Sequence, residues 1–351
     1  QMKTVIANTI WSVERRREHK SEKEMIERCG FNTGNVCFCD TMLSQLNYAD
    51  RISCFDVAHY EKREKDMVFV YPAANWINTS QNILQEYFSP LEKEDIKLCV
   101  LGLGVQMPLE ISAKEFVKSL SEENIRALKI MSEHSVYIGV RGGDSGEVLD
   151  KLGIHNWRII GCPSFYELYR QYGLPEIKTQ KKIKAAASIS GNSKISDIIM
   201  RLAKKNKSVL IMQDIEDIEK ASDAEYENRK IFYTRESWSC YLRREEITFC
   251  FGPRFHGNLM ALSNGIPALW IDHDRRTGEL IETMKLPHMS MEELLCADSV
   301  ERLMDDCVYG KEFQENYMVL LNRYVELLNE CEVEHLISAG NQESSHSCRS
   351  V

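Results

Sequence analysis

The chain has 351 residues and a formal net charge of −9, from 44 Lys and Arg against 53 Asp and Glu. This acidic balance argues against non-specific binding to nucleic acid or to an anionic membrane. With 43% apolar and 28% charged residues, the composition is that of a globular protein and excludes a fibrous or wholly disordered chain. The length predicts two domains rather than one.

Short apolar runs alternate with helical stretches along the first half of the chain. The expected strands are residues 4–7, 52–57, 67–71, 98–103, 136–140 and 157–160. A capping box from Ser119 to Glu122, followed by apolar residues at helical spacing, predicts a helix in this half. Alternation of strand and helix is typical of a parallel sheet covered by helices on both faces.

A polar stretch at residues 173–184 interrupts the alternation, which then restarts with strands expected at 183–189, 209–213, 230–233, 247–251 and 268–271. We therefore predict an α/β fold of two Rossmann-like domains, whose parallel sheets face a cleft. The first domain should cover residues 1–173. The second should cover residues 174–337 and end in a closing helix, and residues 338–351 should form a disordered tail.

The 12 cysteines are scattered and form no CxxC pair, which argues against a zinc site and favours a reducing compartment. The longest apolar run, around residues 99–109, is too short to span a membrane. We expect a cytoplasmic protein that holds no metal and makes at most a peripheral contact with the inner face of the membrane.

The segment from Ile247 to Pro267 carries the most information about function. A buried strand should end at residue 251, and a helix should run from about His256 to Ser263. Arg254 and His256 would then lie at the carboxyl end of a parallel strand, beside a helix N-terminus that favours anions. The sequence alone is equally consistent with an Arg254 that pairs with a carboxylate and a His256 that only caps the helix.

Other strand-to-helix turns carry similar residues. Arg141 follows the strand at 136–140, and the charged loop from Asp272 to Arg276 follows the strand at 268–271, although mutual pairing would explain that loop as well. Asn32 and Asn35 open a helix, which suits either ligand binding or helix capping. The full glycine-rich dinucleotide and P-loop motifs are absent.

Taken together, these motifs resemble one family, the polysaccharide pyruvyl transferases, from about Asn32 to Leu294. The resemblance is carried by the Asn32–Asn35 N-x-G-N, the turn at 101–104, Val140-Arg141-Gly142, the Gly161–Ser164 turn, Arg254-Phe255-His256-Gly257, Gly265-Ile266-Pro267, Asp274 and Arg276. It implies a GT-B-like fold, phosphoenolpyruvate as donor substrate with no further cofactor, and a sugar or lipid-linked oligosaccharide as acceptor. The product would be a pyruvate ketal on a capsule, exopolysaccharide or cell-wall glycan.

The resemblance also implies roles for individual residues. Arg141, Arg254 and Arg276 would bind the donor together with Gly257, and His256 would move a proton. Arg276 stands where some members have Lys, which keeps the charge but changes the geometry.

Asn32, Asn35 and Trp76 are the candidates for binding the acceptor, although Trp76 suits the protein core equally well. The main alternative function is a GT-B glycosyltransferase that uses a nucleotide sugar, with Asp272 or Asp274 holding the ribose.

Overall fold

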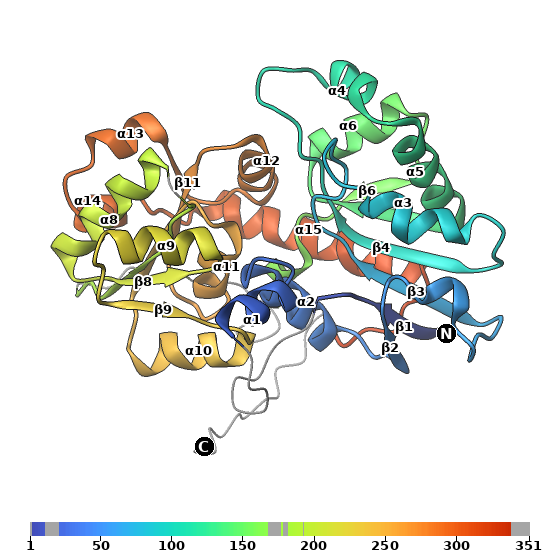
Figure 1. Cartoon of the computed structure of the whole chain (residues 1–351), viewed down its shortest axis with the longest axis horizontal. Helices are drawn as coiled ribbons and strands as arrows, with labels where there is room; N and C mark the ends of the chain where they lie inside the picture. Colours follow the sequence, from blue (N-terminus) through green and yellow to red (C-terminus); the bar gives the residue numbers. More distant parts are fainter. Residues whose placement is uncertain (1, 11–20, 168–176, 178–181, 192, 338–351) are drawn as a thin grey trace.

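The computed structural model describes residues 2–10, 21–167, 177, 182–191 and 193–337. Two parallel six-stranded sheets form two lobes (Figure 1), with strand orders β2-β1-β3-β4-β5-β6 and β12-β11-β10-β7-β8-β9. All the pairings between neighbouring strands are parallel. The expected fold class, two Rossmann-like domains in a GT-B-like arrangement, is confirmed.

Most strands lie close to their expected positions. The strand expected at 52–57 is wrong beyond Ile52, because the chain turns there: the Asp56 N–H donates to the Ser53 carbonyl at 3.0 Å. Those of the first sheet are β1 (Lys3–Ala7), β2 (Asp50–Ile52), β3 (Met67–Pro72), β4 (Lys97–Leu103), β5 (Ser135–Val140) and β6 (Trp157–Ile159). Those of the second are β7 (Ala185–Ala187), β8 (Val209–Met212), β9 (Arg229–Ile231), β10 (Phe249–Gly252), β11 (Ala268–Asp272) and β12 (His288–Ser290). The first sheet is buried along β3 and β4, as expected for strands covered on both faces.

Helices connect the strands and cover the sheets. The first half of the chain has α1 (Glu22–Arg28), α2 (Gly34–Gln45), α3 (Ile83–Phe88), α4 (Ala113–Ser119), α5 (Glu122–His134), α6 (Gly143–Lys151) and the short 3₁₀ turns η1 (Val57–His59), η2 (Ser89–Leu91) and η3 (Pro163–Tyr166). The second half has α8 (Lys194–Asn206), α9 (Ile215–Asp223), α10 (Arg235–Arg244), α11 (Phe255–Leu262), α12 (Arg275–Met284), α13 (Met291–Cys296), α14 (Val300–Asp305) and α15 (Lys311–Glu330). No helix in this described part of the chain has the length and apolar character needed to cross a bilayer.

The C-terminal helix α15 joins the two lobes. The sequence predicts a closing helix for the second domain, and α15 contacts α12 there, but it also packs against β5 and β6 of the first sheet (Figure 1). Its Tyr317 and Tyr324 hydroxyls donate hydrogen bonds to the Phe165 carbonyl and the Gln45 side chain of the first lobe. One apolar cluster therefore runs through both lobes.

Several expectations fall outside the described residues or need correction. The domain boundary at residue 173 and the tail at 338–351 lie outside them and stay predictions. The capping box expected from Ser119 to Glu122 is wrong, because Ser119 ends α4 and the N-cap of α5 is Ser121, whose side chain accepts a hydrogen bond from the Asn124 amide. The three-residue strand β12 has no counterpart among the strands expected from the sequence.

Candidate active site between the two sheets

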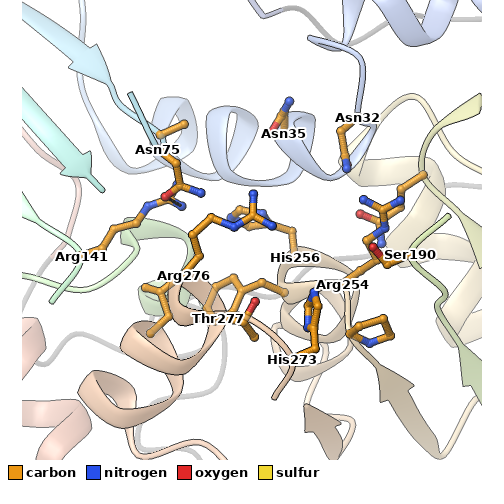
Figure 2. Close-up of a pocket in the computed structure, with 15 residues that line it drawn as sticks. Asn32, Asn35, Asn75, Arg141, Ser190, Arg254, His256, His273, Arg276 and Thr277 are labelled. Carbon is orange, nitrogen blue, oxygen red and sulfur yellow. Dashed lines mark hydrogen bonds between the residues drawn. The ribbon is translucent and has the colours of Figure 1, made fainter. Parts of the chain in front are cut away.

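A cavity of about 140 Å³ lies where the carboxyl ends of the two sheets meet, as expected for ligand sites in open α/β folds. Most of its lining residues follow strands of both sheets, and Asn32 and Asn35 come from the start of α2 (Figure 2). The lining consists of Asn32, Asn35, Ala74, Asn75, Arg141, Ser190, Gln213, Pro253, Arg254, Phe255, His256, His273, Arg276, Thr277 and Leu280. It therefore contains three arginines and two histidines but no carboxylate.

Arg141 follows β5 and supplies a buried cation from the first lobe. Its side chain is only 4% exposed. Nε donates to the Gly102 carbonyl at 2.9 Å and Nη1 to Asn75 Oδ1 at 3.0 Å, so the partners that the structure shows are neutral. Burial lowers the pKa of Arg141 below its usual value. A buried guanidinium held by neutral groups is suited to bind an anionic ligand.

Arg254 follows β10 and is the N-cap of α11. Its Nε donates to the Ile189 carbonyl at 2.8 Å, and its guanidinium pairs with Asp214 and, at 2.8 Å, with the fully buried Asp217. Burial acts to lower the pKa of Arg254, but Asp217 and Asp214 raise it above its usual value. Arg254 is therefore largely neutralised by its own protein, unlike Arg141.

We expect Arg254→Met to destabilise the fold, because it leaves Asp217 buried without its cation. The loss in the free energy of unfolding should be about 3–5 kcal/mol, the usual cost of removing one partner of a buried ion pair. Urea denaturation followed by far-UV circular dichroism measures it. An unchanged midpoint would show that the Arg254 pairs contribute nothing to the fold.

His256 lies in the first turn of α11, between the two lobes. Its Nε2 is 3.5 Å from the Cys162 Sγ of the first lobe, and its ring is tilted against Phe38, with centroids 5.2 Å apart. The pKa of His256 is lowered to about 3, first by burial and then by the charges of Arg141 and Arg276. The imidazole is therefore neutral at neutral pH and can accept a proton.

The third cation, Arg276, comes from the first turn of α12. Its Nε and an Nη donate to Asp274 at 3.1 and 2.6 Å, and its side chain remains 39% exposed. Figure 2 shows this side chain reaching into the cavity beside His256. Asp274 also caps α12 by accepting the Thr277 amide at 2.7 Å. The charged residues of this loop therefore do pair with one another, as the sequence allowed, and Arg276 still faces the cavity.

Behind the cavity, α12 of the second lobe docks onto α6 of the first. The buried Glu279 carboxylate accepts hydrogen bonds from the Ser145 backbone N–H at 2.7 Å and from its hydroxyl at 3.0 Å. Arg275 forms a two-pronged ion pair with Asp144, at 2.7 and 2.9 Å. Burial raises the pKa of Glu279 to about 7, so this carboxyl binds a proton more tightly in the folded protein than in the unfolded chain.

This shift predicts a pH dependence of stability. The stabilisation from protonated Glu279 is complete below the unfolded pKa of 4.5 and is lost as the pH rises through about 7. Between pH 5 and 7, the unfolding free energy of the parent should therefore fall by about 2 kcal/mol relative to Glu279→Gln. Urea titrations of both proteins at these pH values measure the difference. Parallel pH profiles would contradict the assignment.

The structure brings Asn32, Asn35, Arg141, Arg254, His256 and Arg276 to the cavity, whereas it places two other candidates elsewhere. Gly257 lies buried beneath the cavity, where a Cβ would come within 2.5 Å of Gln213 Nε2. Trp76 packs in an aromatic cluster with Tyr71, Tyr87 and Phe88 and does not line the cavity. Trp76 is therefore a residue of the protein core, the alternative that its sequence context also allowed, because its ring packs within this aromatic cluster.

The two asparagines at the start of α2 also have structural tasks. Asn32 Oδ1 accepts the Gly34 amide at 2.8 Å, and Asn35 Nδ2 donates to the Cys29 and Gly30 carbonyls. Both asparagines therefore line the cavity and also stabilise the turn before α2, so the two alternatives that the sequence allowed are combined. Binding of an acceptor by either residue stays a prediction.

Three further residues of the lining were not expected from the sequence, namely Asn75, Ser190 and Gln213. Each follows a strand at its carboxyl end, namely β3, β7 and β8, so the available signal was the position after a predicted strand. Among the described residues, no group of three or more His, Cys, Asp or Glu side chains could hold a metal ion.

Comparison with solved structures finds distant similarity over most of the chain. UDP-GlcNAc 2-epimerase from Neisseria meningitidis, bound to UDP-GlcNAc, is 10% identical, with 88% of this chain and 84% of that chain covered and a TM-score of 0.45. UDP-N-acetylglucosamine 2-epimerase from Rickettsia bellii is 11% identical, with 94% and 98% covered and a TM-score of 0.44. The wall teichoic acid polymerase TagF is 9% identical, with 94% and 89% covered and a TM-score of 0.44.

No curated protein matches the chain. A family model described as polysaccharide pyruvyl transferase matches residues 32–275, which is more than half of the chain and includes Asn32, Arg141, Arg254 and His256. The match ends before Leu294, the limit expected from the motifs, but it confirms the resemblance. The protein belongs to the polysaccharide pyruvyl transferase family.

Proposed function

We propose that the protein transfers the enolpyruvyl group of phosphoenolpyruvate onto a pair of sugar hydroxyls, forming a pyruvate ketal and releasing phosphate. The observation that supports this most directly is Arg141, a buried cation of the cavity lining whose hydrogen-bond partners are neutral. Arg276 faces it from the second lobe while pairing with Asp274, and Arg254 is largely neutralised by Asp214 and Asp217. Phosphoenolpyruvate carries a carboxylate and a phosphate on a three-carbon frame. Cations from both lobes suit such a small ligand with two anionic groups.

The chemistry needs one proton to move to carbon. One sugar hydroxyl attacks C2 of the donor while C3 gains a proton, and the second hydroxyl then attacks C2 as the bond to phosphate breaks. Of the two hydroxyl protons, one ends in the new methyl group and the other leaves with phosphate. His256 is neutral in the cavity, but its pKa of about 3 makes it a weak base until a donor is bound. With its pKa raised by the donor's negative charges, it would accept a hydroxyl proton and pass it on.

Arg141 and Arg276 would serve this chemistry by holding the donor next to His256. Burial, and after it the charges of these two arginines, lower the pKa of His256 while no anion is bound. An arriving phosphate and carboxylate offset these charges, which makes His256 a stronger base when a donor is present. The same cations would thus bind the donor and prepare the proton carrier.

A ligand screen distinguishes this function from that of a glycosyltransferase using a nucleotide sugar. Phosphoenolpyruvate at about 100 times its Kd should stabilise the protein by ~2.7 kcal/mol, seen as a rise in Tm. Nucleotide sugars should give no rise, because neither Asp272 nor Asp274, the candidate ribose ligands, lines the cavity. A rise with a nucleotide sugar alone would contradict the proposal.

A further inference from the structure

Gln213 follows β8 and lines the cavity from the second lobe. The residue is only 1% exposed, and its Nε2 has no hydrogen-bond partner among the described residues. Leaving such a donor buried and unpaired costs about 1–3 kcal/mol. The orphan donor therefore indicates a ligand that supplies the missing acceptor.

The space for this side chain is formed by two glycines, one from each lobe. A Cβ at Gly34, in the first turn of α2, would overlap Gln213 Oε1, and a Cβ at Gly257, in the first turn of α11, would come within 2.5 Å of Nε2. The backbone carbonyl of Gln213 also accepts the Thr33 amide at 2.8 Å. The side chain therefore lies in a confined space where α2 and α11 meet.

The surroundings of Nε2 favour a negatively charged acceptor. Nε2 lies beside Gly257, where the first-turn N–H groups of the eight-residue helix α11 have no partner within the helix. The positive end of the helix dipole adds to these donors, and helix N-termini are suited to bind phosphate. A neutral hydroxyl would gain less from this environment than a phosphoryl group would.

The two ends of the cavity are also chemically different. Figure 2 shows Arg141 and Arg254 on opposite sides of His256. The planar fork of Arg141, held by neutral partners, suits a carboxylate. The other end holds Arg254, the N-cap of α11, and Gln213, whose backbone N–H donates at 3.0 Å to the Asp217 that pairs with Arg254. The Gln213 amide and the N-terminus of α11 offer several separate donors there, which suits a phosphoryl group with three oxygens.

Resting on the proposed function, we propose that Gln213 Nε2 donates a hydrogen bond to a phosphoryl oxygen of the donor, at a phosphate subsite completed by the N-terminus of α11. The donor carboxylate then faces Arg141, and C2 lies next to His256. The same subsite holds inorganic phosphate once it has been released.

The test compares Gln213→Met, which keeps the side-chain length and removes the donor, with Arg141→Met. Calorimetric titrations use phosphoenolpyruvate and inorganic phosphate. A lost hydrogen bond to a charged group should raise the Kd of Gln213→Met about 10- to 100-fold for both ligands. Arg141→Met should weaken phosphoenolpyruvate binding while changing phosphate binding by less than about threefold.

The stability of the variant separates a binding role from a structural one. Because Gln213→Met removes an unpaired buried donor, its Tm without ligand should equal or exceed that of the parent. A lower Tm together with unchanged Kd values would make Gln213 a packing residue and overturn the inference. Weaker phosphoenolpyruvate binding with unchanged phosphate binding would overturn it too. If the parent itself does not bind phosphoenolpyruvate, the proposed function fails instead.

Discussion

Replacing Arg141 by methionine should weaken the binding of phosphoenolpyruvate by about 2–5 kcal/mol, a rise in Kd of at least about 30-fold. The effect is large because Arg141 is buried and its hydrogen bonds go to the neutral oxygens of Gly102 and Asn75. Its charge is therefore available to a ligand. Methionine fills much of the same space without a charge, so the apo fold should survive.

Isothermal titration calorimetry measures the change for Arg141→Met. Arg126→Met is the matched control, because Arg126 lies in the same lobe, is 67% exposed and pairs with Glu92 on the surface. The control should bind phosphoenolpyruvate like the parent. Equal affinities for all three proteins would place the anion site elsewhere.

Replacing His256 by alanine should lower kcat by about 10²–10⁴-fold while most of the donor affinity remains. His256 lies between the cations rather than acting as one of them, and its neutral imidazole is the group placed to carry a proton. Loss of a proton carrier affects the transfer step more than binding. The measurement is phosphate release at saturating phosphoenolpyruvate with a panel of sugar diols as acceptors.

His155→Ala serves as the control, since this histidine is 72% exposed and pairs with Asp150 on the surface. Its turnover should match that of the parent. If His256→Ala turns over within about tenfold of the parent, below the range of a positioned acid or base, His256 is structural and water or another group moves the proton. Proton NMR of the parent should also show the His256 pKa rising when phosphoenolpyruvate binds.

Much of the site could be anticipated because its residues follow predicted strands. Arg141 and Arg254 come directly after buried apolar runs, and parallel strands place their carboxyl ends at one edge of a sheet. The start of α11 at Phe255 also agrees with the expected helix. Local patterns were sufficient here, since each position depends on its own strand and turn.

The charge state of the site depends on contacts between residues that are far apart in the sequence. Arg254 is neutralised by the carboxylates of Asp214 and Asp217. These residues lie about 40 residues earlier in the sequence and follow a different strand. Similarly, the low pKa of His256 has burial as its largest cause, followed by the charges of Arg141 and Arg276. No local motif reports such tertiary contacts.

Aromatic residues and short elements show a second limit of sequence analysis. Trp76 in a polar loop has the composition of a sugar-stacking site, yet its ring is covered by Tyr71, Tyr87 and Phe88. The strand β12 has only three residues and no apolar run, so nothing in its sequence separates it from a loop. Both outcomes depend on packing partners.

The most direct test of the account is a crystal structure of the parent protein with phosphoenolpyruvate. We expect the ligand in the cavity between the sheets, with its carboxylate on Arg141, its phosphate at the N-terminus of α11 and its C2 beside His256. Binding of phosphoenolpyruvate elsewhere, or of a nucleotide sugar in its place, would contradict the proposed donor.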